Sequence, residues 1–181
     1  MNIRDIITLI EEHSSIIKLY HITDKARFNL DPDYEPIDNS ISIEDRSGRK
    51  GIYLTQDVEK WVNGHGYLRP FVAEIYADPS ILEMKGRWAG EIFVPKEHFE
   101  KLKVNRVVPL DVIARETYGA HGWIESSNGY EFDTGNQIDY KKVYPYNDYK
   151  YSGDTRKMSS DEIKKLKKHF STGYKNRLKY R

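Results

Sequence analysis

Residues 16–23 read Ile-Ile-Lys-Leu-Tyr-His-Ile-Thr. The run is short and rich in β-branched and aromatic side chains, which is typical of a buried β-strand. We expect residues 16–21 of this run to form the first strand of a sheet and to carry the imidazole of His21 at its end. A strand positions its side chains more rigidly than a loop does, so His21 is a candidate for a functional site.

Two later segments have the same character and each carries a polar group of its own. Residues 51–55 read Gly-Ile-Tyr-Leu-Thr and place the ring of Tyr53 on a second strand. Residues 90–95 read Gly-Glu-Ile-Phe-Val-Pro and place the carboxylate of Glu91 at the start of a third. An imidazole, an aromatic ring and a carboxylate on three strands predict a single cleft.

Periodicity and turn formers outline the rest of the chain. We expect further strands at 71–76 and 106–110, helices at 3–13 and 57–62, and a helical turn at 96–102. Turn formers at 29–50 predict a long surface loop, and the stretch from Asp111 onward is interpreted as hairpins and loops. Ser159 and Glu162 form a capping-box pattern, so a helix is expected over about 160–170.

The length and composition favour one folded domain that is not a membrane protein. The chain has 181 residues, of which 38% are hydrophobic, and its 14 Tyr and 6 Phe add apolar area. We expect a single domain over 1–150 and a C-terminal helix and tail over 151–181. The absence of cysteine, of a long apolar run and of a signal peptide predicts a cytoplasmic protein with no membrane partner.

The net charge of +1 conceals an uneven distribution. From Lys150 onward there are eleven Lys and Arg against three acidic residues, so this tail carries about +8 and the preceding body about −7. Aromatic residues lie among the cations of the tail. This pattern allows nucleic-acid binding, in which cations contact phosphates and rings stack on bases, but a solvated helix face is an equal alternative.

The order and flanking residues of His21, Tyr53 and Glu91 resemble the His-Tyr-Glu class of the ADP-ribosyltransferase superfamily, which includes diphtheria-type toxins and poly-ADP-ribose polymerases. The resemblance rests on Tyr-His-x-Thr, Gly-Ile-Tyr-Leu-Thr and Gly-Glu-Ile-Phe-Val-Pro, and covers about residues 19 to 110. It implies an α+β fold built on a split, mostly antiparallel β-sandwich with flanking helices. Singly, each residue has a structural explanation, as a strand-end histidine, a core tyrosine or a solvated glutamate.

The resemblance also assigns roles to individual residues. His21 resembles the histidine that hydrogen-bonds a ribose of NAD, the backbone of Ile22 would hold the nicotinamide amide, and Thr23 stands at the family's Ser or Thr. Tyr53 resembles the ring that stacks on nicotinamide. Glu91 resembles the catalytic glutamate that stabilises the positive charge developing on the ribose. The implied activity is NAD-dependent transfer of ADP-ribose to a macromolecular acceptor, protein or nucleic acid, with release of nicotinamide.

Several residues modify or compete with these assignments. Arg69 is a candidate for the pyrophosphate of NAD, because a guanidinium binds phosphate in bidentate fashion. Glu74 is a second candidate for the catalytic carboxylate. Relatives that modify arginine carry Glu or Gln two residues before the catalytic glutamate, and Ala89 stands there in this chain.

The six histidines lack the spacing of a metal site, and neither a GxGxxG nor a P-loop motif is present, so we expect no metal and no Rossmann-type NAD site.

The alternative functions belong to two further classes. An RNA 2'-phosphotransferase would use NAD within the same fold. A non-enzymatic nucleic-acid-binding module would act through the basic tail. The acceptor, the oligomeric state and the choice between transfer and NAD hydrolysis stay open.

Overall fold

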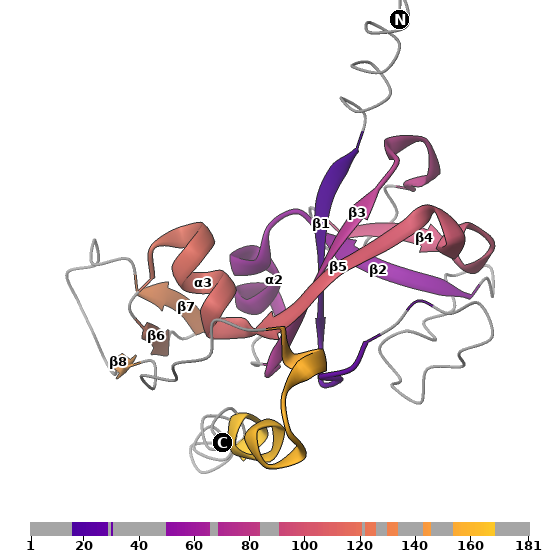
Figure 1. Cartoon of the computed structure of the whole chain (residues 1–181). Helices are drawn as coiled ribbons and strands as arrows, with labels where there is room; N and C mark the ends of the chain where they lie inside the picture. The colour runs from indigo at the N-terminus through magenta and orange to yellow at the C-terminus, as the bar shows by residue number, and fades with distance from the viewer. Residues whose placement is uncertain are drawn as a thin grey trace, which may run out of the picture.

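The structure is a computed structural model, and it describes residues 16–28, 30, 50–65, 69–83, 91–120, 122–125, 130–133, 143–145 and 154–168. Its architecture is α+β (Figure 1). The main sheet has five strands in the order β4-β2-β1-β3-β5, and each strand is antiparallel to its neighbours. Its strands are β1 (Ile17–Thr23), β2 (Gly51–Thr55), β3 (Phe71–Ala77), β4 (Glu91–Pro95) and β5 (Leu102–Pro109).

The pairing of β1 with its two neighbours is unequal. On one side, all seven residues of β1 are in register with β3, from Ile17 opposite Ala77 to Thr23 opposite Phe71. On the other side, β1 and β2 are in register at a single pair, Tyr20 and Thr55. The sheet therefore divides into a β4-β2 half and a β1-β3-β5 half that join at one residue pair.

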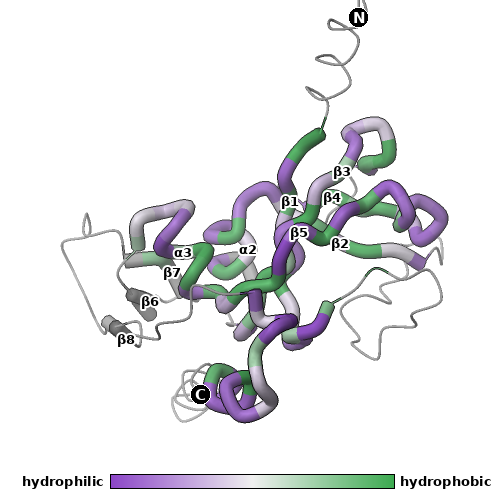
Figure 2. Tube along the Cα trace, in the orientation of Figure 1, coloured by the Kyte–Doolittle hydropathy of each residue, from purple (hydrophilic) through white to green (hydrophobic). Residues whose placement is uncertain are grey.

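Each face of the sheet packs against its own hydrophobic cluster. Cluster one lies on the face that carries Leu19 and Ile52, and it includes Leu166 from the C-terminal part of the chain. Cluster two lies on the face that carries Tyr20, and it contains buried residues of α2 (Val58–His65) and α3 (Leu110–Tyr118). Helices thus cover both faces. Figure 2 shows hydrophobic residues along the main-sheet strands and a mostly hydrophilic helix at 160–168.

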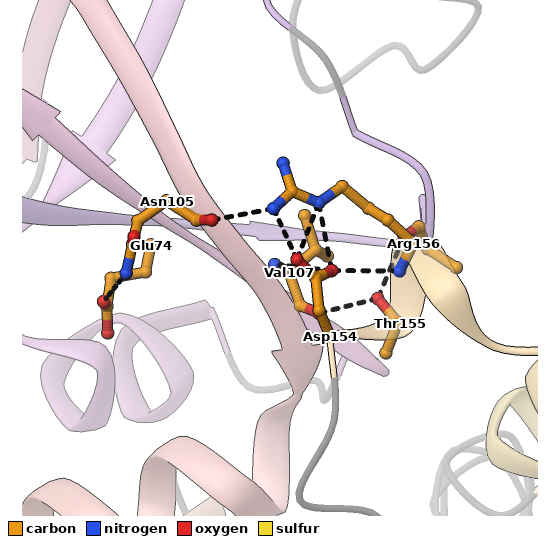
Figure 3. A network of polar contacts seen from close by, with 7 residues as sticks. Glu74, Asn105, Val107, Asp154, Thr155 and Arg156 are labelled. Atoms are coloured by element: carbon orange, nitrogen blue, oxygen red, sulfur yellow. Dashed lines mark hydrogen bonds and ion pairs between the residues drawn. The ribbon is translucent and has the colours of Figure 1, made fainter.

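Both edges of the main sheet are covered by other parts of the chain. At the β4 edge, Glu83 and Phe93 exchange two backbone hydrogen bonds of 2.8 and 2.7 Å. At the β5 edge, the Val107 amide donates to Asp154 Oδ1 at 3.3 Å and the Val107 carbonyl accepts from the Thr155 hydroxyl at 2.8 Å (Figure 3). These contacts satisfy backbone groups that an edge strand leaves exposed.

The C-terminal segment packs against one face of the main sheet as well as against its β5 edge. It begins with the 3₁₀ turn η3 (Thr155–Lys157), which is followed by helical residues 160–168. Ser159 and Glu162 form the predicted capping box, because the Ser159 amide and hydroxyl donate to Glu162 Oε2 at 2.8 and 2.7 Å. Leu166 is fully buried in cluster one. The division of the chain between 150 and 151 stays a prediction.

A second, smaller sheet follows α3. Its strands are β6 (Gly122–Glu125), β7 (Tyr130–Asp133) and β8 (Val143–Pro145), in the antiparallel order β7-β6-β8. Phe132 is buried in cluster two, and its ring contacts that of Tyr118 at a centroid distance of 4.9 Å. In the parts of the chain that the structure describes, no helix is long and apolar enough to span a bilayer.

Most of the predicted elements are confirmed within a few residues. The strands at 16–21, 51–55, 71–76 and 91–94 are β1 to β4, the helix at 57–62 is α2, and the turn at 96–102 is η2 (Lys96–Lys101). A short 3₁₀ turn, η1 (Pro79–Ile81), follows β3. The predicted helix at 3–13 and nearly all of the predicted loop at 29–50 lie outside the described residues.

The prediction was wrong where β5 meets α3. The expected strand at 106–110 begins earlier, at Leu102, and ends at Pro109, while residues 110–118 form a helix and not a hairpin or loop. The helix begins with five buried residues, Leu110 to Ala114, and its exposed residues, Arg115 to Thr117, follow only in its second half. Gly119 closes the helix in the left-handed conformation with φ 64°, the usual helix-ending glycine, and this was the available signal.

Candidate functional site

His21 is held in one orientation near the end of β1. Its ring is 4% exposed, and Nδ1 lies 3.0 Å from the carbonyl oxygen of Tyr53. Because a carbonyl oxygen only accepts, Nδ1 carries the hydrogen and donates it. This contact fixes the tautomer of the neutral imidazole and makes Nε2 its acceptor nitrogen.

The ring of Tyr53 packs against the neighbouring strand. Tyr53 stands directly opposite Phe93 in the β2–β4 pair, with the ring centroids 5.1 Å apart and the planes at 53°. Gly51 allows this arrangement, since a Cβ at that position would lie 2.4 Å from the Phe93 ring. The glycine of Gly-Ile-Tyr-Leu-Thr therefore has a packing role beside the tyrosine.

Glu91 and Tyr53 project from the same face of the sheet. Glu91 is in register with Thr55, and Tyr53 is in register with Phe93. Directly opposed residues share a face, as do residues two apart on one strand. Both side chains are half-buried. The β4-β2 half of the sheet therefore presents an aromatic ring and a carboxylate side by side, both partly open to solvent.

The imidazole of His21 lies on the opposite face. It stacks on Phe28 of cluster one, with the ring centroids 5.0 Å apart, whereas its two neighbours in β1 face cluster two. The structure thus does not place the side chains of His21, Tyr53 and Glu91 on a single face. It connects His21 to the backbone of Tyr53 where the two halves of the sheet join.

The two residues after His21 are buried. Ile22 packs in cluster two opposite Val72. Thr23 is fully buried, and its hydroxyl oxygen accepts from the Lys25 amide at 3.1 Å. Such a bond shapes the turn that follows the strand. The side chains of Ile22 and Thr23 thus have structural roles.

Arg69 lies at the same end of the sheet as Thr23. Thr23 is in register with Phe71, two residues after Arg69, and the Arg69 Nε lies 3.9 Å from the Asp24 carboxylate. The guanidinium also lies 5.9 Å from the centre of the Trp61 ring, and the side chain is 15% exposed. The fold therefore brings Arg69 close to the segment that begins with His21.

The rival carboxylate, Glu74, is enclosed by partners. It is 3% exposed in the middle of the main sheet, and it accepts from Asn105 Nδ2 at 2.8 Å (Figure 3) and from Arg106 Nη2 at 3.2 Å. Lys18 Nζ lies 3.9 Å away. The pKa of Arg106 is raised, mainly by its hydrogen bond to Glu116 and further by Glu74. Glu74 is thus a buried carboxylate paired with partly exposed cations, which favours a structural role.

Two polar residues of α3 were missed in the sequence. The Tyr118 hydroxyl accepts from the Val58 amide at 2.9 Å and lies 3.3 Å from Asp57 Oδ1, so it satisfies the first turn of α2. Burial and the nearby Asp57 raise the pKa of Tyr118 to about 12. Asp111 is 1% exposed, and neither carboxylate oxygen has a hydrogen-bond partner among the described residues. An aspartate inside the apolar run Leu-Asp-Val-Ile was the signal for it.

Comparisons with known proteins give no further assignment. No family model, no curated protein and no solved structure matches this chain. Among the residues that the structure describes, no three His, Asp or Glu side chains gather in a way that could hold a metal ion. The functional assignment therefore rests on the site residues and their geometry.

Proposed function

We propose that the chain is an NAD-dependent ADP-ribosyltransferase that modifies a macromolecule and releases nicotinamide. The observation that carries the proposal is the hydrogen bond from His21 on β1 to the Tyr53 carbonyl on β2, the strand adjacent to β4, which carries Glu91. The three residues occur in the order that the His-Tyr-Glu class requires. The unequal pairing of β1 with its neighbours supports the split sheet of that class, which we propose as the fold type.

The reaction breaks the bond between the nicotinamide nitrogen and ribose C1′. The bonding electrons leave with nicotinamide, and the ribose becomes oxocarbenium-like, as in glycoside cleavage. A nucleophilic atom of the acceptor then bonds to C1′, and its proton passes to solvent or to the nearby carboxylate. Glu91 would stabilise the positive ribose and orient the acceptor, an electrostatic effect that can dominate rate enhancement.

The remaining residues would bind NAD and orient it. The half-buried ring of Tyr53 offers a stacking surface for nicotinamide, and offset stacking contributes about 0.5 to 1.5 kcal/mol beyond area burial. The fixed tautomer of His21 gives an acceptor nitrogen for a ribose hydroxyl. The backbone of Ile22 and the guanidinium of Arg69, whose side chain is 15% exposed, would contact the nicotinamide amide and the pyrophosphate. His21 and Tyr53 face opposite sides of the sheet, so one NAD molecule would have to contact both faces near the junction of the two sheet halves.

The catalytic role of Glu91 can be tested with labelled NAD. We expect nicotinamide release by the wild-type chain and a loss of at least about 100-fold in the Glu91→Gln variant, the range associated with removal of one preorganised electrostatic group. Glu100→Gln is the matched control, since it removes an exposed carboxylate from η2. Equal rates in Glu91→Gln and wild type, with both folded, would refute the assignment. The RNA 2'-phosphotransferase stays an alternative prediction, and transfer of an RNA 2'-phosphate to NAD would favour it.

A further inference from the structure

The helical residues 160–168 present a basic surface in a fixed orientation. Leu166 is fully buried in cluster one and Ile163 packs against it. On a helix with 3.6 residues per turn, the side opposite Leu166 carries four exposed lysines within an arc of less than half a turn. These are Lys164, Lys165, Lys167 and Lys168, and we call them the lysine face. Asp161 also lies on this side and pairs with Lys164 at 3.7 Å.

The anchoring of this helix limits the kind of partner that it can bind. An interfacial membrane helix needs a free apolar face to insert between lipids. Here the apolar side chains Ile163 and Leu166 are already packed against the sheet. The lysine face is therefore suited to a partner that is recognised by charge alone and that carries closely spaced negative groups, which is the property of a nucleic-acid backbone.

The charge distribution of the chain adds to this preference. The tail from Lys150 carries about +8 and the body about −7. Four more basic residues follow the helix in the sequence, Lys175, Arg177, Lys179 and Arg181. A polyanion would be repelled by the negatively charged body and attracted to the positively charged tail. The electric field of the protein therefore favours the approach of a nucleic acid to the tail.

The helix is also connected to the candidate site. The Thr155 hydroxyl lies 2.9 Å from the carbonyl oxygen of Ala26, three residues after Thr23, and 2.8 Å from that of Val107. Phe28, on the same segment as Ala26, stacks on His21. A polymer on the lysine face would thus lie on an element fixed to the segment that follows His21, on the sheet face of His21, and it would reach Glu91 on the other face only by passing around the sheet.

We propose that the lysine face is a nucleic-acid docking surface and that the nucleic acid is the acceptor of ADP-ribose. The second part rests on the proposed function, whereas the first does not. In the transfer step the C1′–nicotinamide bond breaks with its electrons leaving on nicotinamide. A nucleophilic nitrogen or oxygen of the nucleic acid bonds to C1′, and its proton is lost to solvent.

The docking step is tested by binding without NAD. Fluorescent single-stranded RNA and DNA of mixed sequence are titrated with the full chain over a range of salt concentrations. Changing the four lysines of the lysine face to alanine should weaken binding about 30-fold at low salt and lower the slope of log affinity against log salt by about 3, since each phosphate contact on a single strand contributes about 0.7. The control changes Lys50, Lys60, Lys101 and Lys103, exposed lysines on other elements, to alanine. It removes the same charge and should retain most of the affinity.

Each result decides one part of the proposal. Equal weakening in both variants, or no binding by the wild-type chain, overturns the docking surface. Anionic vesicles or a poly-glutamate peptide bound as tightly as nucleic acid also overturn it. If docking is found and labelled NAD modifies protein but not nucleic acid, the acceptor assignment is wrong. If no substrate accepts the label and no nicotinamide is released, the proposed function fails while the docking surface stands.

Discussion

The Nδ1 atom of His21 donates a hydrogen bond of 3.0 Å to the carbonyl oxygen of Tyr53, and this contact lies where β1 and β2 are in register at only one pair. A side chain thus connects two strands that share little backbone pairing. One partner is a candidate NAD-binding residue and the other belongs to the second candidate segment. A substitution that removes this hydrogen bond should therefore change both the candidate site and the stability of the sheet.

His21→Ala should destabilise the fold as well as reduce activity. The variant loses a buried hydrogen bond and a ring stacked on Phe28, so we expect the free energy of unfolding to fall by about 2 to 4 kcal/mol. Urea denaturation measures this change. His98→Ala, a half-buried histidine on η2, is the control and should cost less than about 1 kcal/mol. Equal losses in the two variants would show that the contact with Tyr53 contributes little.

Gly51→Ala tests the close approach of β2 to Phe93. The added Cβ would lie 2.4 Å from the Phe93 ring and 2.5 Å from the Val94 carbonyl oxygen, so overpacking should cost about 1 to 3 kcal/mol. Phe93→Leu in the same chain should recover only part of this loss, because the Val94 carbonyl remains. The measurement is chemical denaturation of the single and double variants.

Gly119→Ala provides the contrasting case. A Cβ there meets nothing within 4 Å, and the expected cost of about 1 kcal/mol comes from the left-handed backbone alone. A stability of Gly51→Ala equal to that of the wild type would contradict the packing at Phe93.

Asp111→Asn should stabilise the chain at neutral pH. Burial raises the pKa of the Asp111 carboxyl above its ordinary 3.8, with smaller opposing effects of Arg115 and of the nearby backbone amides of Asp111 and Val112. The folded state therefore holds this proton more tightly than the unfolded state, and wild-type stability falls as pH rises from the ordinary pKa through the raised one. The amide carries no charge, so the variant escapes that loss.

The gain from Asp111→Asn should be about 1 to 3 kcal/mol at about pH 7 and should disappear toward about pH 3. Unfolding free energies across this pH range measure it. Glu100→Gln, an exposed carboxylate, should give no such pH-dependent gain. A variant that is less stable than wild type at neutral pH would show that the Asp111 carboxylate has a stabilising partner.

Thr155→Val tests whether the C-terminal segment belongs to the folded body. The substitution keeps the shape but removes the hydroxyl that lies within hydrogen-bond distance of the Ala26 and Val107 carbonyls, so it should cost about 1 to 3 kcal/mol. The matched control is Thr117→Val at an exposed position of α3, which should change stability by less than about 0.5 kcal/mol. A single unfolding transition in which Thr155→Val matches wild type would contradict the anchoring role of Thr155.

The strands of the main sheet were predictable because their local signals agree with the tertiary structure. Residues 51–55 combine a β-branched and an aromatic residue between a glycine and a threonine, and β2 has those bounds. The capping box of Ser159 and Glu162 depends on neighbours in the sequence, and its hydrogen bonds form as predicted. Helix α3 was missed, and the burial of its first five residues, the charged Asp111 among them, shows that tertiary packing stabilises it.

The candidate site residues stay a prediction from the sequence, and their geometry was not predictable from it. Alternation along β1 and β2 places His21 and Tyr53 on opposite faces only once the register of Tyr20 with Thr55 is known, and a sequence does not contain that register. The burial of Glu74 among Asn105 and Arg106 also depends on strand order. Asp111 was missed because its lack of a partner is a property of the packed structure.

The central claim is that His21, Tyr53 and Glu91 bind one molecule of NAD, and a crystal structure of the chain soaked with NAD tests it most directly. The account predicts the nicotinamide ring against Tyr53, a ribose hydroxyl within hydrogen-bond distance of His21, and the Glu91 carboxylate beside the nicotinamide ribose. NAD bound elsewhere on the chain, or bound without contact to Tyr53 and Glu91, would contradict the account.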